Sequence, residues 1–196
     1  MEARMSTLTA QTHLTPEEYL AWERKQPFKN EYHNGQIIAM SGASRAHNLI
    51  TMNMANQFYT QLVAQGCEIY PGDMRVQIRQ PTSYFYPDIV VVCSEPRFED
   101  DTFDTLLNPV LIVEVLSPST AAFDRGGKFE YYQQLDSLQE YMLISQNRVH
   151  VERYLRRDTQ WILTEFRKTD EVIHLLSNRC KLSVRDIYTL VKFPEA

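Results

Sequence analysis

The sequence has little cysteine and no long apolar run. Its 196 residues include three cysteines, Cys67, Cys93 and Cys180, which lie far apart and form no CxxC pair. This spacing argues against a disulfide framework or a zinc ribbon and is typical of a protein kept in a reducing cytoplasm. No apolar stretch approaches the roughly 20 residues that cross a bilayer, and the polar start lacks the apolar core of a signal peptide. We therefore expect a cytoplasmic protein with no membrane partner.

An excess of positive charge is also missing. The formal net charge of -5 gives no overall attraction to polyanions, so a nucleic acid would have to be held by a local patch or a metal ion. The hydrophobic content of 43% and charged content of 23% are ordinary for a globular chain, and the length suits one domain. Without a repeat or a low-complexity linker, we predict one domain over residues 13–196 after a flexible N-terminal segment, 1–12.

Turn and cap signals divide the chain into helices and strands. Thr15 predicts a helix N-terminus, and Asn34-Gly35 between two strand-like runs predicts a β-hairpin. Apolar runs predict two buried strands, in YPDIVVV and LIVEVLS, and a parallel crossover through a helix to EYMLIS. We also expect a second pair of strands in CEIYPGDMRVQIR. The predicted helices lie at about residues 16–25, 44–64, 121–135 and 182–193.

This succession predicts the fold class. Mixed helices and strands with one parallel crossover indicate an α+β (α/β/α) protein, in which a central mixed β-sheet is flanked by helices.

Two carboxylates interrupt the buried strands. Glu114 lies in the middle of LIVEVLS, where side chains alternate between two apolar faces. A lone ionised carboxylate buried there would cost several kcal/mol, so Glu114 needs a cation, a metal ion or a proton. Asp88 follows Pro87 at the start of the other strand, where a simple capping role and a functional role both remain open.

A lysine on the following helix is the candidate partner. At roughly 100° per residue, Lys128 shares the apolar side of its predicted helix with Tyr131 and Leu135. The alternatives are an i,i+4 pair with Asp124, or a lysine that extends from the helix edge into water. Two carboxylates and a lysine suit phosphodiester hydrolysis with Mg²⁺ or Mn²⁺, because such an ion activates water and stabilises charge on phosphorus.

Four ordered motifs carry a resemblance to a known family: NEYHNGQI, YPDIVVV, LIVEVLSPST and DRGGKFEYYQQL. They resemble the Uma2 family, also called DUF820, of PD-(D/E)xK restriction endonuclease-like proteins, over about residues 15–154. In the basic ExK motif the lysine would stand at Leu116. The family pattern implies that Lys128, on the next helix, takes its place.

The resemblance implies a role for each residue. Asp88 and Glu114 would bind Mg²⁺, or Mn²⁺, together with the carbonyl of Val115, while Lys128 would assist the attacking water. Glu31 would be the acidic member from the N-terminal segment. Three further residues are second-tier candidates: His47, Asp124 and Arg125. His47 could equally be a plain residue of a helix start, and Arg125 could meet either phosphate or solvent.

The activity expected from this resemblance is metal-dependent endonuclease cleavage of DNA. The chain would hold its DNA substrate through local contacts only. Cutting both strands with one site per chain would favour a homodimer. A catalytically inactive member of the fold that binds nucleic acid or protein is the first alternative. A two-carboxylate glycoside hydrolase, which would need neither metal nor lysine, is the second.

Overall fold

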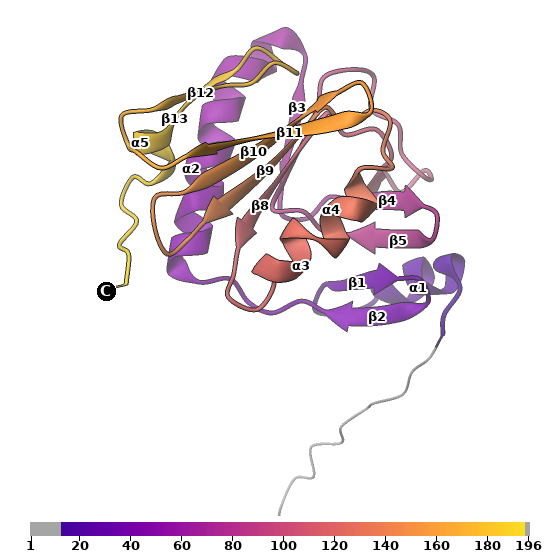
Figure 1. The fold of residues 1–196 in the computed structure, drawn as a ribbon. Helices are drawn as coiled ribbons and strands as arrows, with labels where there is room; N and C mark the ends of the chain where they lie inside the picture. The colour runs from indigo at the N-terminus through magenta and orange to yellow at the C-terminus, as the bar shows by residue number, and fades with distance from the viewer. Residues whose placement is uncertain (1–12, 195–196) are drawn as a thin grey trace, which may run out of the picture.

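A six-stranded mixed sheet forms the centre of the computed structural model, which describes residues 13–194 (Figure 1). The strand order is β11-β10-β9-β8-β6-β3, and the one parallel pair, β8 with β9, confirms the predicted crossover. The segment 1–12, predicted to be flexible, lies outside the described residues. The six strands are β3 (Glu68–Pro71), β6 (Ile89–Val92), β8 (Leu111–Leu116), β9 (Glu140–Ser145), β10 (Val151–Arg157) and β11 (Gln160–Phe166).

A second, five-stranded sheet has the order β2-β1-β5-β4-β7. Its first hairpin is the predicted one: Asn34 and Gly35 have φ values of 46° and 93°, as a two-residue hairpin turn of type I′ requires. The strands are β1 (Asn30–His33), β2 (Gln36–Ala39), β4 (Arg75–Arg79), β5 (Thr82–Phe85) and β7 (Thr105–Leu106). A small third sheet pairs β12 (Val172–His174) with β13 (Lys181–Ser183).

The prediction that β3 and β4 form a pair is wrong. The strands lie in different sheets, β3 beside β6 and β4 beside β5. Both are strands, as expected, but the chain turns at Gly72, with φ of 80°, and leaves the central sheet for the second one. Which neighbour a strand takes depends on long-range contacts that its own sequence does not contain.

Helices cover both faces of the central sheet (Figure 1). On one face, α2 (Arg45–Leu62) buries Met54 and Phe58 in an apolar cluster that includes Val113. On the other face, α4 (Gly127–Tyr132) buries Phe129 and Tyr132 against Ile112. The α/β/α arrangement is thus confirmed. The remaining helical elements are α1 (Pro16–Glu23), the 3₁₀ turn η1 (Val63–Gln65), α3 (Ala121–Arg125) and α5 (Val184–Ile187).

Helix boundaries follow the cap signals at the N-termini better than at the C-termini. Thr15 forms a capping box with Glu18, and Ser44 caps α2 through the N–H of His47. The single helix predicted over 121–135 is wrong, because Gly126 departs from helical geometry and separates α3 from α4. The predicted terminal helix, 182–193, is shorter than expected at both ends: its first two residues belong to β13, and the helix already ends at Ile187.

The cysteine prediction is also wrong. Cys67 and Cys93 form a disulfide that links the ends of β3 and β6, next to the paired residues Glu68 and Val92. The two cysteines are distant in sequence but neighbours across an antiparallel ladder. Cys180 is free and buried. The cysteines therefore do not indicate a reducing compartment, and the cytoplasmic location stays a prediction. Within residues 13–194, no helix combines the length and apolar character of a membrane span.

The disulfide predicts a thiol count. Protein purified and unfolded without reductant should show one reactive thiol, from Cys180, and three after reduction. A chromogenic thiol titration in denaturant measures both values. A Cys180→Ser control should show no thiol before reduction. Three thiols in unreduced wild type would contradict the Cys67–Cys93 bond.

Candidate active site

Lys128 lies at the centre of a buried acidic cluster. Its Nζ is 3.0 Å from Glu31 Oε1, 3.0 Å from Glu114 Oε1 and 3.8 Å from Asp124 Oδ1. The acids come from β1, β8 and α3, so one ammonium group joins both sheets and the helical layer. Lys128 is only 6% exposed, so it does not extend into water. The i,i+4 contact with Asp124 is present, but it is the longest of the three.

The acids and the ammonium group change one another's ionisation. Burial lowers the pKa of Lys128, but the charges of Glu114, Glu31 and Asp124 outweigh burial and raise it. Burial raises the pKa of Glu31, yet Lys128 and hydrogen bonds overcome this and bring the pKa down to about 2. In Glu114 and Asp124 burial wins over Lys128, so both pKa values are raised. The cluster therefore holds more acid than one lysine neutralises.

Asp88 lies beside Glu114 at the end of the central sheet. The antiparallel β6–β8 register pairs Ile89 with Val113. Asp88, one residue before Ile89, therefore comes next to Glu114, one residue after Val113. Asp88 Oδ2 accepts a hydrogen bond of 2.6 Å from the N–H of Val115. Because the N–H and C=O of a strand residue point to the same side, the Val115 carbonyl faces this side as well.

His47 contacts Asp88 from the first turn of α2. Its Nε2 lies 3.1 Å from the Asp88 carboxylate, and its own N–H donates to the Ser44 side chain that caps the helix. The structure thus brings together Glu31, Asp88, Glu114, Lys128 and two second-tier residues, His47 and Asp124.

Arg125 is not part of this group. Its guanidinium points away and forms a close pair with the buried Glu152 on β10, with Nη2 2.6 Å and Nε 2.9 Å from Oε1. The neighbouring residue Asp124 faces inwards to Lys128. Of the two second-tier residues on α3, only Asp124 therefore belongs to the site.

Tyr132 is a site residue that the sequence reasoning missed. Its O–H donates a 2.9 Å hydrogen bond to Glu114 Oε1, the same oxygen that Lys128 contacts. Tyr132 is fully buried. The signal for it was available, since it stands four residues after Lys128 on the same helix face.

The oxygen atoms of the site suit a hard divalent cation. Lys128 and Tyr132 occupy Glu114 Oε1, whereas Oε2 accepts no hydrogen bond from residues 13–194. Mg²⁺ binds proteins through one or two carboxylates and keeps several waters, so Asp88, Glu114 and a carbonyl are enough. In this described part, no cluster of three or more His, Cys, Asp or Glu side chains has the arrangement of a metal centre. Water or substrate would complete the shell.

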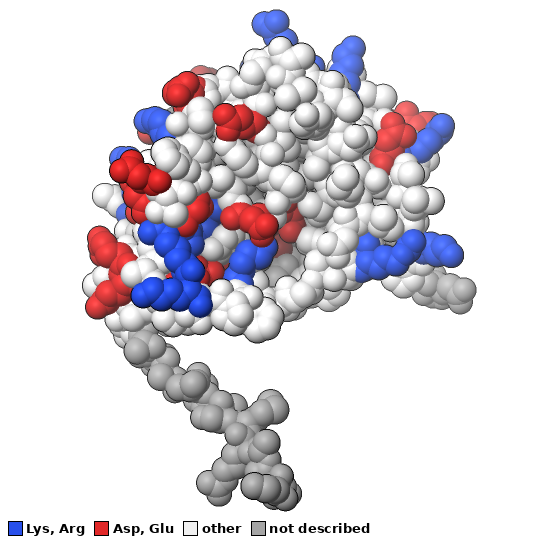
Figure 2. Space-filling view, turned by 180° about the vertical axis from the view of Figure 1, so that it is seen from behind, with Lys and Arg blue, Asp and Glu red and all other residues white. Residues whose placement is uncertain are grey.

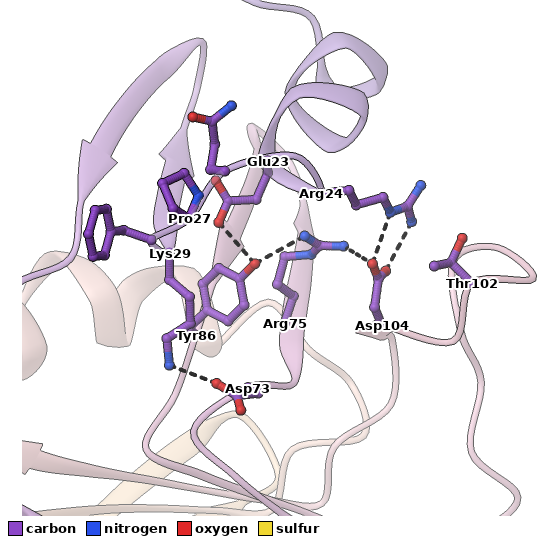
Figure 3. A pocket seen from close by; sticks show the side chains of 11 residues that line it. Glu23, Arg24, Pro27, Lys29, Asp73, Arg75, Tyr86, Thr102 and Asp104 are labelled. Atoms are coloured by element: carbon purple, nitrogen blue, oxygen red, sulfur yellow. Dashed lines mark hydrogen bonds and ion pairs between the residues drawn. The ribbon is translucent and has the colours of Figure 1, made fainter.

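A hollow beside the site has its charges paired internally (Figure 3). It measures about 510 Å³. Tyr86 O–H donates to Glu23 and accepts from Arg75, which also pairs with Asp104 at 2.5 Å. The N–H of Tyr86 donates to Glu31 Oε1 at 3.2 Å. This network holds Tyr86, two residues before Asp88, in place. The charged groups of the network already have partners within the protein.

The family model of Uma2, described as "Putative restriction endonuclease", matches residues 16–185. The chain belongs to the Uma2 family. Two curated proteins of Synechocystis sp. are similar to it. "Uncharacterized protein slr1290" is 39% identical over 92% of this chain and 94% of that protein, and "Uncharacterized protein sll1609" is 43% identical over 78% and 86%.

A solved structure shares the fold of this Uma2 chain. It is described as "a putative nuclease belonging to DUF820 from Anabaena variabilis", with a TM-score of 0.74 and 20% identity, over 91% of this chain and 99% of that one. The predicted family and the restriction endonuclease-like fold are confirmed.

The Uma2 chain departs from the basic nuclease motif at Leu116. This residue is buried on the same strand face as Glu114, in the apolar cluster that also contains Phe129 and Tyr132. Lys128 reaches Glu114 from α4 instead. The ammonium group therefore approaches the acid from the helix layer rather than from the strand itself.

The buried contacts predict a large stability effect at Lys128. Lys128→Met removes the counter-charge of Glu31 and Glu114, and we expect the free energy of unfolding to fall by about 3–5 kcal/mol. Lys29→Met is the matched control. Lys29 is 40% exposed and pairs with Asp73, 90% exposed, so its loss should change stability by about 1 kcal/mol or less. Urea unfolding without divalent metal compares them, and equal effects would contradict the central position of Lys128.

Proposed function

We propose that this chain is a Mg²⁺-dependent endonuclease that hydrolyses DNA phosphodiester bonds, with Mn²⁺ as a possible substitute. The observation that carries the proposal is the contact of Lys128 with both Glu31 and Glu114, beside Asp88, at one end of a restriction endonuclease-like sheet. Membership of a family described as "Putative restriction endonuclease" supports the same reaction class.

The chain's own groups would divide the work as follows. Asp88 and Glu114 would hold the ion, with the Val115 carbonyl. When bound, Mg²⁺ lowers the pKa of a water ligand and stabilises charge that develops on phosphorus. Lys128 would orient the attacking water, and Glu31 would keep the ammonium group in place.

Two neighbours would keep the metal ligands in position. His47 contacts the Asp88 carboxylate, and Tyr132 donates to Glu114 Oε1, which leaves Oε2 open towards an ion. Partners of this kind fix the orientation of metal ligands.

DNA would be held by local contacts. On the face in Figure 2, acidic and basic side chains are intermixed at the lower left, and the blue groups form no continuous surface. The net charge of -5 likewise gives the chain no overall attraction to DNA. The ion would therefore supply much of the positive charge that meets the scissile phosphate. The proposal includes a cytoplasmic location and a homodimer, because two sites related by a two-fold axis can cut both strands.

Removal of one metal ligand tests the activity. Glu114→Gln should reduce cleavage to the level of an EDTA control, because the amide keeps the size of the side chain but loses its charge. The assay uses supercoiled plasmid, single-stranded DNA and branched DNA with Mg²⁺, Mn²⁺ or EDTA. Glu130→Gln, an exposed acid on the same helix as Lys128, is the matched control and should cleave like wild type.

The remaining outcomes separate the alternatives. Full activity in a folded Glu114→Gln protein would sink the proposed site. Silence on every DNA with retained metal binding would mean that the substrate is different. Silence without metal binding would favour a catalytically inactive member that binds nucleic acid or protein. Hydrolysis of a glycoside in EDTA would favour the two-carboxylate hydrolase.

Tyr132 predicts a separate effect on metal affinity. Tyr132→Phe removes only the O–H that fixes Glu114 Oε1, so we expect Mn²⁺ to bind about 10-fold more weakly. Electron paramagnetic resonance of free Mn²⁺ gives the dissociation constant independently of turnover. Tyr131→Phe is the control from the neighbouring position and should bind Mn²⁺ as wild type does. Unchanged affinity in Tyr132→Phe would show that this hydrogen bond does not position the ligand.

A further inference from the structure

Gln146 lies directly after β9, beside the strand that carries Glu114. It follows Ser145, which pairs with Leu116 at the end of β8. Its Nε2 donates a 2.9 Å hydrogen bond to the Leu116 carbonyl, and the residue is only 7% exposed. Because a carbonyl oxygen only accepts hydrogen bonds, this contact turns the NH₂ group of the amide towards β8 and leaves the amide oxygen for another partner.

The Gln146 oxygen determines the direction of the Ser44 hydroxyl group. Ser44 Oγ lies 2.5 Å from Gln146 Oε1, and an amide oxygen only accepts, so Ser44 donates its single hydrogen here. The lone pairs of Ser44 Oγ are left for α2, where the N–H of His47 donates to them at 3.0 Å. Gln146 therefore selects the hydroxyl orientation that caps the first turn of α2.

The path from Gln146 ends at Asp88. His47 Nε2 lies 3.1 Å from the Asp88 carboxylate, which also accepts the 2.6 Å hydrogen bond from the N–H of Val115. Val115 is covalently joined to Leu116, whose carbonyl Gln146 binds, so the contacts close into a ring. The ring connects the ends of β8 and β9 with the start of α2, and it holds the Asp88 carboxylate from two sides.

We infer that Gln146 is a positioning residue of the metal site, which acts on the Asp88 carboxylate through Ser44 and His47. The inference rests on the proposed function, in which Asp88 holds the ion. Without Gln146, the exposed Ser44 hydroxyl group would donate to water in several directions, and the turn that carries His47 would be held less firmly. Loss of groups that orient metal ligands typically weakens metal binding about 10-fold or more.

Amide hydrogen exchange followed by NMR tests the ring without metal. Gln146→Met keeps the approximate size of the side chain but removes both hydrogen bonds. The N–H of Val115 should then exchange several-fold faster, because its acceptor is held less firmly. Val113, on the same strand, is the internal reference and should exchange as in wild type. Gln61→Met is the matched control, since Gln61 also joins α2 to a strand, through the N–H and carbonyl of Lys181, but at the other end of the helix.

Mn²⁺ binding, measured by electron paramagnetic resonance, tests the path to Asp88. Gln146→Met and Ser44→Ala should each bind Mn²⁺ about 10-fold more weakly, and Gln61→Met should bind it as wild type does. Adding Gln146→Met to His47→Ala should weaken binding no further than His47→Ala alone, because both changes interrupt one path. Losses that simply add in the double variant would show that Gln146 does not act through His47, and would overturn the inference.

The two measurements separate this inference from the proposed function. A wild type that binds no Mn²⁺ contradicts the proposed metal site, while the exchange rate of Val115 still decides whether Gln146 holds Asp88. Unchanged exchange at Val115 in folded Gln146→Met overturns the inference, and so does equal acceleration at Val115 and Val113, which indicates a general loss of stability. If circular dichroism shows that Gln146→Met does not fold, Ser44→Ala breaks the same path at an exposed position. Unchanged Mn²⁺ affinity in that variant also overturns the inference.

Discussion

The buried ammonium group of Lys128 is the interaction on which the rest of the structure depends. It contacts Glu31 in the second sheet, Glu114 in the central sheet and Asp124 in the helix layer. Replacing such a group by apolar side chains of similar volume is often neutral or stabilising, whereas removing one partner leaves a buried charge and is costly. Stability alone therefore does not explain why this arrangement exists. The proposed function would explain it, because a divalent ion would need several carboxylates presented together.

Asp124 and Lys128 face the same buried point although Gly126 separates α3 from α4 between them. Gly126 leaves helical geometry between them, and Gly127 allows a close approach: a Cβ on Gly127 would come within 2.9 Å of the Phe123 ring. A single uninterrupted helix would have been consistent with the apolar periodicity, which is why the sequence predicted one. Glycine at these two positions instead lets the short helices pack against each other over the end of β8.

The sequence predicted the features that depend on a few neighbouring residues, such as the first hairpin and the need of Glu114 for a cation. Asn34-Gly35 requires a hairpin, and the cost of burying Glu114 without a counter-charge leads to a cation such as Lys128. Three differences between prediction and structure share one physical cause, which is pairing over long sequence distances. The partner of β4, the Cys67–Cys93 bond and the capture of Arg125 by Glu152 all depend on segments that meet only after folding. Tyr132 shares the helix face of Lys128, so the spacing could have placed it near the site, but the acceptor of its O–H, Glu114, lies on a separate strand.

The excess of carboxylates at the site and the negative net charge of the chain both mean that a phosphate could approach only with the help of a cation. Glu31, Glu114 and Asp124 surround one ammonium group, and Asp88 lies beside Glu114. Desolvation keeps the pKa of Glu114 and Asp124 above ordinary values. Such a site repels a phosphate until a cation reverses its sign. A divalent ion at Asp88 and Glu114 would relieve the repulsion among the acids and attract the substrate in one step. Because an ion that binds only the folded chain stabilises it, occupancy of the site would couple the fold to the chemistry.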